Sequence, residues 1–398
     1  MTRIGFAFNL KPESQSPEAV ADQAENRVVD GDLSRPEEEP PSGSAPGSDE
    51  FAEWDSAETI DAVAEALAEL GEVIRLEADE NFPEKLRASK PDIVFNIAEG
   101  RYGPNRESHV PAICEFFGIP YTGSDPFTLS LCLDKGRTKE TLAFHGIPTA
   151  AFSIVHSMDE LVAVGRRMPM PLFVKPVHEG SSKGITEKNF CRTTRELEAQ
   201  VKFLLDTYEQ PVLVEEYLPG NEFTCAVLGN GPDARVLPLV GMNFGELPEG
   251  AMPIYGYEAK WIWDRPENPL NMFDCPARIG DALRQSIEEL TLRAYNALGC
   301  RDWSRVDVRL NADGIPNVVE VNPLPGILPR PEDNSCLPKA ARATGIDYNE
   351  LIQSCLQYAA RRQGVLLPAK LRVVRGERSS RPEGLERLGA NIGTRLKA

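Results

Sequence analysis

The spacing of hydrophobic positions in the first third of the chain switches between two periods, and each switch predicts a new element. Residues 2–9 form a short apolar run, which is typical of a buried strand. Residues 56–70, with Ser56 as a helix start signal, repeat apolar side chains at helical spacing until Gly71. Two apolar strands, EVIRLEA and DIVFNI, follow, and HVPAICEFFGIP at 109–120 predicts a helix that ends at Gly118. This alternation predicts an α/β domain with a parallel sheet over residues 1–134.

The rest of the chain is richer in strand patterns. Residues 136–150 predict a helix, and AFSIV, PLFVKPV and VLVEEYL predict three strands, with a polar helix between the first two. From residue 222 the period is mostly two, as in EFTCAVLG and RVLPLVGM, and helices are expected at 279–299 and 348–362. A chain of 398 residues is expected to form two or three domains.

Two segments have no such period. Residues 11–50 are acidic and rich in Pro, Ser and Gly, a composition that buries too little apolar surface to fold alone. We therefore expect a solvated, disordered insertion at this place. Residues 364–398 lose periodicity and gain arginine, so a loosely held tail is expected there.

Charge and amino-acid composition argue against several classes of protein. The net charge of −18 argues against general nucleic-acid binding, which needs a basic footprint. No apolar run reaches the roughly 18 residues of a membrane span, and the start, MTRIGFAFNL, is too short for a signal peptide, so a cytoplasmic protein is expected. The eight cysteines are scattered without a CxxC pair, which favours reduced structural thiols.

A predicted hairpin at 305–322, RVDVRLNADGIPNVVEVN, places unusual side chains opposite one another. A turn centred on Asp313-Gly314 would pair Asp307 with Glu320 and Arg305 with Asn322, and would put Val306, Val308, Val319 and Val321 on the other face. A β-bulge would shift this register. Directly opposed Cβ atoms lie about 4.5–5.5 Å apart, so two carboxylates and an amide oxygen suit Mg²⁺. A solvated face with Arg309 neutralising the acids is the alternative.

A second motif, LFVKPVHEGSSKGI at 172–185, delivers Lys175 on a strand and then a Gly-Ser loop. Such a loop can hold phosphates with its N–H groups, although it is not a Walker A sequence, and an ordinary polar turn is the alternative. Residues 180–184 also match the GxSxG elbow of serine hydrolases. That interpretation fails because no histidine follows His178.

Two further motifs are ambiguous alone. In VLVEEYLPGNEFT, Glu215 and Glu222 could bind sugar hydroxyls or an amino group, or could be exposed charges at a strand end. In EAKWIWD, Lys260 lies among aromatic residues, where a lysine stem often covers a ring.

In this order the motifs resemble the ATP-grasp superfamily and, within it, the D-alanine–D-alanine ligase branch. The resemblance runs from about residue 88 to 362 and includes GIPYTGSD, Leu133-Asp134-Lys135, FVKPVHEGSSKGI, YEAKW, GCRDWSRVDVRL and VEVNPLPGI. It implies an α/β fold with a three-domain ATP-grasp architecture. An N-terminal parallel α/β domain would precede a central subdomain at 135–216 and a C-terminal subdomain at 217–363, with α+β character in the ATP-binding part.

The resemblance also implies roles for residues of this sequence. Lys135 and Lys175 would contact ATP phosphates, Lys175 also lying near the adenine, and Ser181 and Ser182 would belong to a loop that closes over the nucleotide, Ser182 as a catalytic residue. Glu215 would line the adenine pocket, Glu222 would hold the ribose, and Lys260 would reach the γ-phosphate. Asp307, Glu320 and Asn322 would bind two Mg²⁺ ions, or Mn²⁺, and Arg305 would stabilise the oxyanion.

The implied reaction is ATP-dependent ligation of a carboxylate and an amine through an acyl phosphate. The substrate side departs from the family: Glu99 replaces a histidine, Trp261 replaces a tyrosine, and the acceptor loop with Gly326 and Ser335 is longer. Glu53 or Asp55 could replace the acidic residue that grips the first amino group. We therefore expect other amino-acid or peptide-like substrates. The resemblance also implies a homodimer. A true D-alanine–D-alanine ligase and a non-catalytic ATP-binding protein are the alternatives.

Overall fold

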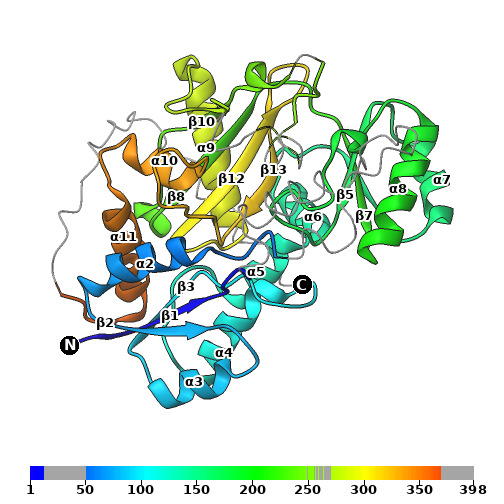
Figure 1. Cartoon of the computed structure of the whole chain (residues 1–398). Coiled ribbons are helices and arrows are strands. Elements are labelled where there is room, and N and C mark those ends of the chain that lie inside the picture. The colour runs from blue at the N-terminus through cyan, green and yellow to red at the C-terminus, as the bar shows by residue number, and fades with distance from the viewer. Residues whose placement is uncertain are drawn as a thin grey trace, which may run out of the picture. The chain divides into compact units, whose positions relative to one another are not determined.

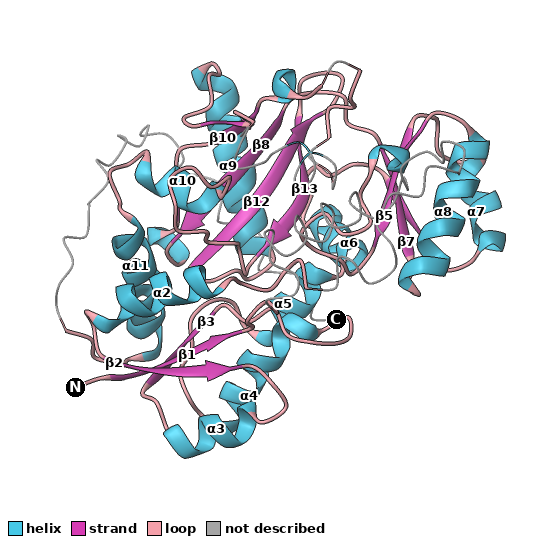
Figure 2. Ribbon diagram, in the orientation of Figure 1, coloured by secondary structure: helices cyan, strands magenta, loops and turns pink. Residues whose placement is uncertain are grey.

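The structure is a computed structural model that describes residues 1–12, 51–248, 250–254, 256, 259, 263 and 270–368. Most of the expected insertion and tail, residues 13–50 and 369–398, lies outside the described residues. In the described part the strands form three sheets, shown with their helices in Figures 1 and 2. No helix in this part is long and apolar enough to cross a membrane.

The N-terminal sheet is parallel, in the order β2-β1-β3, and consists of β1 Arg3–Phe8, β2 Glu72–Glu77 and β3 Ile93–Asn96. Phe6 packs toward α2 (Ala57–Ala68), and Ala7 packs with α3 (Phe82–Ser89) and α4 (His109–Phe117). Burial on both faces explains the unbroken apolar run of β1. The predicted α/β arrangement of this region is confirmed.

Local signals fix the helix ends. Ser56 caps α2 by accepting the Thr59 N–H at 3.3 Å. Gly118, with φ of 66°, ends α4 as predicted. Two helices, α5 Pro126–Leu133 and α6 Lys135–Phe144, then lead out of this sheet.

The second sheet is antiparallel, in the order β4-β7-β5-β6. Its strands are β4 Phe152–Val155, β5 Leu172–Pro176, β6 Phe190–Cys191 and β7 Val212–Glu216. The helices α7 (Met158–Gly165) and α8 (Thr194–Tyr208) cover one face, where Val174 and Val214 are fully buried. Because side chains alternate along a strand, Lys175 and Glu215 belong to the opposite face.

The third sheet is antiparallel, in the order β11-β10-β8-β12-β13, with β9 also paired to β8. Its strands are β8 Glu222–Leu228, β9 Arg235–Val236, β10 Val240–Met242, β11 Phe273–Asp274, β12 Trp303–Leu310 and β13 Pro316–Asn322. RVLPLVGM is therefore two short strands and not one, because Pro238 lacks an N–H for the ladder.

Helix α9 (Asp281–Ala297) packs on the valine face of this sheet, as Figure 2 shows behind β8 and β12. α10 (Cys336–Arg342) follows the hairpin, and α11 (Tyr348–Gln363) packs with α2 in one apolar cluster. Single 3-10 turns occur at Arg106–Ser108, Glu187–Asn189, Gly231–Asp233 and Phe244–Glu246. Helices α9 and α11 confirm the helices that were expected at 279–299 and 348–362.

The hairpin of β12 and β13 has the predicted register at the carboxylates. Asp307 pairs with Glu320, and Arg305 pairs with Asn322. A bulge after Asp307 then pairs Val308 with Val318. The expectation that Val319 faces the core was wrong, because the bulge absorbs one residue and Val318 takes that place.

Candidate functional site

The Asp307 carboxylate is held from three sides on the face of the third sheet opposite α9. Its Oδ2 accepts bonds from Arg305 Nη2 at 3.0 Å and from Asn322 Nδ2 at 3.3 Å. Its Oδ1 accepts the Thr224 hydroxyl at 3.0 Å, from the neighbouring strand β8. Three residues predicted as metal or oxyanion contacts are therefore together, and Thr224 joins them.

Glu320 faces a lysine from a distant segment. Lys135 Nζ, at the first residue of α6, lies 2.8 Å from Glu320 Oε1. Burial opposes ionisation of Glu320, but the charges of Lys135 and Lys175 outweigh it and lower the pKa to about 2. Glu320 is consequently an anion at neutral pH.

Glu215 is enclosed by two lysines. Its carboxylate oxygens lie 2.8 Å from Lys175 Nζ and 2.7 Å from Lys139 Nζ. Burial would raise the pKa of Glu215, yet the two positive charges lower it to about 2. Lys139 also donates to Thr149 Oγ1 at 2.8 Å. Burial lowers the pKa of Lys139, although the charge of Glu215 opposes this shift. The two lysines and Glu215 therefore form a buried cluster with one carboxylate between two amino groups.

The Gly-Ser loop lies against this region. Ser181 and Ser182 have φ of 49° and 62°, a left-handed conformation that bends the chain sharply. Lys135 Nζ donates to the Glu179 carbonyl just before the loop. The loop predicted to hold phosphates is therefore joined to the same lysine that contacts Glu320.

Glu222 is paired with an arginine of the hairpin. Arg309 Nη1 donates to Glu222 Oε2 at 2.9 Å, and Nη2 reaches the Tyr217 hydroxyl at 3.1 Å. The pKa of Glu222 is raised, chiefly by burial and also by the charge of Asp307, despite the opposing charge of Arg309. Arg309 thus neutralises Glu222 and not the facing pair of carboxylates.

The N-terminal segment contributes a second group of carboxylates. Glu53 is ion-paired with Arg106 at 2.7 Å and accepts the Gly180 N–H at 2.9 Å. Burial raises the pKa of Asp55 to about 7. Burial and then the charges of neighbouring carboxylates, including Glu53, raise the pKa of Glu99 well above its usual value. Of the residues considered for the first substrate, Glu53 contacts the Gly-Ser loop directly.

The acceptor loop is closed by Ser335. Its hydroxyl donates to the Gly326 carbonyl at 3.2 Å and accepts the Leu328 N–H at 3.1 Å. Gly326 and Ser335 therefore lie together, as expected of one subsite. Lys260 and Trp261 lie outside the described residues.

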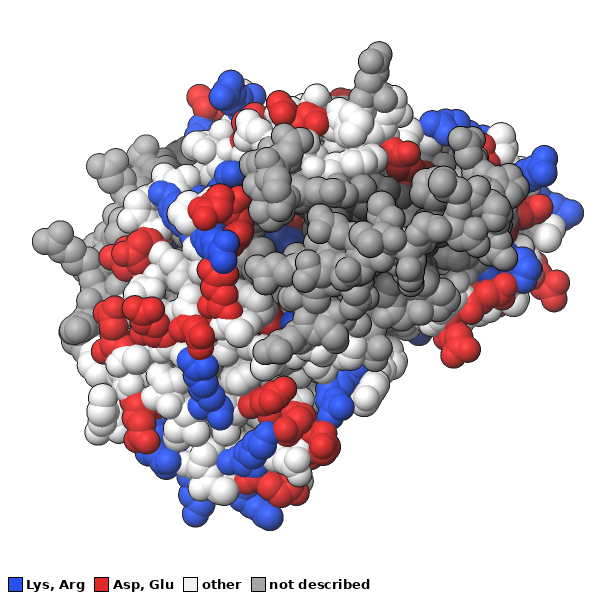
Figure 3. All heavy atoms as spheres, viewed as in Figure 1, with Lys and Arg blue, Asp and Glu red and all other residues white. Residues whose placement is uncertain are grey.

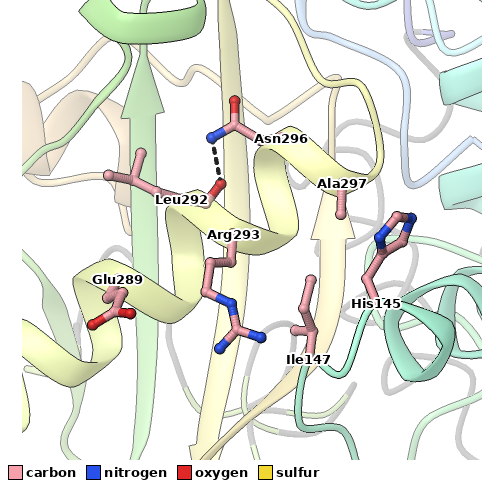
Figure 4. A pocket seen from close by; sticks show the side chains of 7 residues that line it. All are labelled: His145, Ile147, Glu289, Leu292, Arg293, Asn296 and Ala297. Atoms are coloured by element: carbon pink, nitrogen blue, oxygen red, sulfur yellow. Dashed lines mark hydrogen bonds between the residues drawn. The ribbon is translucent and has the colours of Figure 1, made fainter. Parts of the chain in front are cut away.

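A shallow surface pocket of about 380 Å³ lies elsewhere, between the end of α6 and α9 (Figure 4). It is lined by His145, Ile147, Glu289, Leu292, Arg293, Asn296 and Ala297, none of which is a predicted site residue. On the face in Figure 3, acidic and basic side chains of the described residues are interspersed. That face therefore carries no broad basic field for nucleic acid among the described residues.

Comparisons with known proteins agree with this geometry. A family described as "D-ala D-ala ligase C-terminus" matches residues 142–357. A D-alanine–D-alanine ligase of Bordetella petrii is 37% identical over 276 residues, which are 69% of this chain and 78% of that protein. The chain belongs to the D-alanine–D-alanine ligase family. The predicted branch of the ATP-grasp superfamily is thereby confirmed, and the chain is a ligase-family enzyme.

One further relative and one solved structure are also similar to this chain. An uncharacterised protein of Sinorhizobium fredii is 36% identical over 318 residues, covering 78% of this chain and 89% of that protein. The crystal structure of a Bacillus anthracis D-alanine–D-alanine ligase complexed with ATP superposes with a TM-score of 0.60 at 22% identity, covering 92% of this chain and 99% of that chain. The ATP-grasp fold of the D-alanine–D-alanine ligases is confirmed.

Several site residues were not predicted from the sequence. Lys139 follows Lys135 by four residues in one helix, a spacing that places both on the same face and was a usable signal. Thr224 and Arg106 carry no such signal. Arg106 lies in a segment whose hydrophobic positions show neither helix nor strand periodicity, and its contact with Glu53 depends on the tertiary structure.

Proposed function

We propose that this chain joins a substrate carboxylate to an amine at the expense of ATP, releasing ADP and phosphate. Family membership makes the chain an ATP-dependent ligase that forms an amide bond. The substrates are proposed to be amino acids or small peptide-like molecules. Relatives called D-alanine–D-alanine ligase, 34–38% identical to this chain, favour amino-acid substrates in general.

The facing pair Asp307 and Glu320, with lysines beside it, is the observation that carries this proposal. A solvated face would expose both carboxylates, but only 12% of the Asp307 side chain and 23% of the Glu320 side chain are exposed. Two such anions held close together are costly unless a cation joins them. Lys135 supplies one such positive charge beside Glu320, and we propose that a metal ion supplies another between the two carboxylates.

The donor set fits Mg²⁺. Asp307, Glu320 and Asn322 offer hard oxygen atoms from one face of a hairpin, which is the chemistry that Mg²⁺ prefers. The proposed ligands are thus two carboxylates and one amide oxygen; among the described residues no group of three or more His, Cys, Asp or Glu could hold a metal ion. We propose two ions. When bound, they would neutralise phosphate charge.

The remaining roles follow from position and charge. Lys135 and Lys175 would bind phosphate oxygens, and Ser181 and Ser182 would lie in the loop that covers them. Glu215 would line the adenine pocket and Glu222 the ribose. Lys260, outside the described residues, would reach the γ-phosphate. These are proposals for positioning and charge neutralisation, which dominate phosphoryl transfer.

The reaction would proceed in two steps. A carboxylate oxygen of the first substrate attacks the γ-phosphorus and ADP leaves, giving an acyl phosphate. The amine nitrogen of the second substrate then attacks the acyl carbon, loses a proton, and phosphate leaves. Arg305, held by Asp307, would stabilise the oxyanion of the second step. A closed Gly-Ser loop would exclude water from the acyl phosphate.

The division of the chain into 1–134, 135–216 and 217–363 is also a proposal. It is supported by the three sheets, each of which lies inside one of these ranges. The homodimeric state and the cytoplasmic location stay predictions. Sedimentation of the full chain at several concentrations measures the first of them.

Incubation with ATP, Mg²⁺ and a panel of amino acids tests the function. We expect phosphate release that depends on the amine, with a product whose mass equals the two substrates minus water. D-Alanine alone, giving its dipeptide, would favour the specific D-alanine–D-alanine ligase. ATP binding without any amide product across the panel would favour the non-catalytic alternative.

A further inference from the structure

Four charged side chains join the N-terminal segment to the Gly-Ser loop. They are Glu53, Arg106, Glu179 and Lys183, and we call them the latch cluster. Their side chains are 6%, 8%, 14% and 10% exposed. Two acids and two bases cancel, so the cluster is neutral and does not itself attract phosphate.

Glu53 is the centre of the latch cluster. Arg106 donates to both of its oxygens, from Nε at 3.1 Å and from Nη2 at 2.7 Å. The same carboxylate accepts the Gly180 N–H at 2.9 Å and Lys183 Nζ at 3.2 Å. Bidentate charge-assisted bonds are stronger and more directional than neutral ones. Glu53 therefore binds two residues of the Gly-Ser loop, Gly180 and Lys183, at the same time.

Arg106 also contacts the loop without Glu53. Its Nη1 donates to the His178 carbonyl at 2.9 Å. Glu179 is fixed by Lys183 at 2.5 Å and by Gln210 Nε2 at 2.8 Å. The segment 178–183 is thus tied at both of its ends.

The latch cluster leads to the proposed metal site. Lys135 Nζ donates to the Glu179 carbonyl and lies 2.8 Å from Glu320 Oε1. A displacement of the 178–183 segment would therefore move the lysine that balances Glu320. This connection gives Arg106, which is not among the proposed catalytic residues, an influence on the reaction.

We propose that Arg106, acting through Glu53, is a positioning residue that holds the Gly-Ser loop closed over the phosphates. This inference rests on the proposed function. The loop held in this way keeps water from the acyl phosphate, so phosphate release stays coupled to amide formation. Without the latch, water attacks the acyl carbon and phosphate leaves with no amide formed.

Limited trypsin digestion of the full chain tests the latch independently of activity. In Arg106→Met, cleavage after Lys183 should rise about 10- to 100-fold, the change expected from losing charge-assisted bonds that oppose local opening. Arg284→Met, which breaks the exposed pair with Asp281 on α9, is the matched control and should leave this cleavage unchanged. An equal rise at every trypsin site would mean global destabilisation and would overturn the proposal.

The second measurement is how tightly phosphate release is coupled to amide formation. The ratio of phosphate released to amide formed should rise in Arg106→Met, with partial rescue in Arg106→Lys because lysine cannot form the bidentate pair. Gly180→Ala should act likewise with every charge intact, because the new Cβ would lie 2.5 Å from Glu53 Oε1. In a protein that already carries Glu53→Ala, Gly180→Ala should not raise this ratio further. A normal ratio in Arg106→Met and Gly180→Ala refutes the latch, whereas absence of amide synthesis in the unmodified protein refutes only the proposed function.

Discussion

The replacement Glu215→Gln tests the buried charge cluster most directly. Glutamine keeps the volume and one acceptor oxygen but removes the negative charge between Lys139 and Lys175. The pKa of Glu215 falls from 4.5 to about 2 in the folded chain. At about 1.4 kcal/mol per pKa unit, this depression corresponds to about 3–4 kcal/mol of stability at neutral pH. Only 6% of the side chain is exposed, so solvent screening reduces this value little.

The sign of the pH dependence follows from the depressed pKa. The contribution of Glu215 is fully present above pH 4.5 and is lost as the pH falls through about 2. Protonated Glu215 removes the nearest counter-charge of both lysines, just as glutamine does. The stability difference between the unmodified protein and Glu215→Gln should therefore keep its full value from pH 7 to about pH 4.5 and should shrink as the pH falls from there toward about 2.

Urea unfolding followed by tryptophan fluorescence measures this difference at several pH values. Glu198→Gln, on the exposed side of α8, is a control expected within about 0.5 kcal/mol. Adding Lys139→Met to Glu215→Gln should recover part of the loss, because one unpaired buried charge disappears. A Glu215→Gln protein within about 0.5 kcal/mol of the parent at pH 7 would refute the reasoning.

Three other predictions concern other residues of the chain. Glu320→Gln should lower turnover by more than about 100-fold while ATP affinity changes only modestly, measured by phosphate release and calorimetry; unchanged turnover would exclude Glu320 as a metal ligand. Arg362→Met should destabilise the chain by about 3–5 kcal/mol, seen as a lower Tm, because Asp302 is fully buried and pairs with Arg362 at 2.7 Å; an unchanged Tm would contradict this. Deleting 25–48 should leave ligase activity intact, since its acidic composition offers no core; loss of activity would give the insertion a role.

The fold was predictable where local pattern and tertiary structure agree. The N-cap at Ser56 and the glycine after α4 stand in the sequence and are used as predicted. The helix α8 was not singled out, although Thr193 and Glu196 form a capping box that marks its start. The bulge after Asp307 could not be derived from alternation, because one extra residue leaves the period of the flanking segments unchanged.

The site was predictable as a set of residue types but not as a set of contacts. Lysines and carboxylates were identified one by one from motifs. Their pairing, Lys135 with Glu320 and Lys175 with Glu215, joins segments far apart in the sequence and is decided by packing. The same holds for the Glu53 pair with Arg106, whose partner lies in an irregular segment.

These pairings lead to a last prediction about how ATP binds. Free ATP would offer phosphate to Lys135 and deprive Glu320 of its nearest counter-charge, whereas Mg²⁺ and ATP together supply both charges. ATP affinity should therefore fall about 5- to 150-fold when Mg²⁺ is removed, the usual range of coupling between two ligands.

In Glu320→Gln the dependence of ATP affinity on Mg²⁺ should weaken. Lys135 no longer has an ion pair with residue 320 to break, and phosphate binding to Lys135 leaves no carboxylate unpaired there. Titration calorimetry with and without Mg²⁺, on both proteins, measures the coupling. Equal Mg²⁺ dependence in the two proteins would show that Glu320 and Lys135 do not exchange partners when the nucleotide binds.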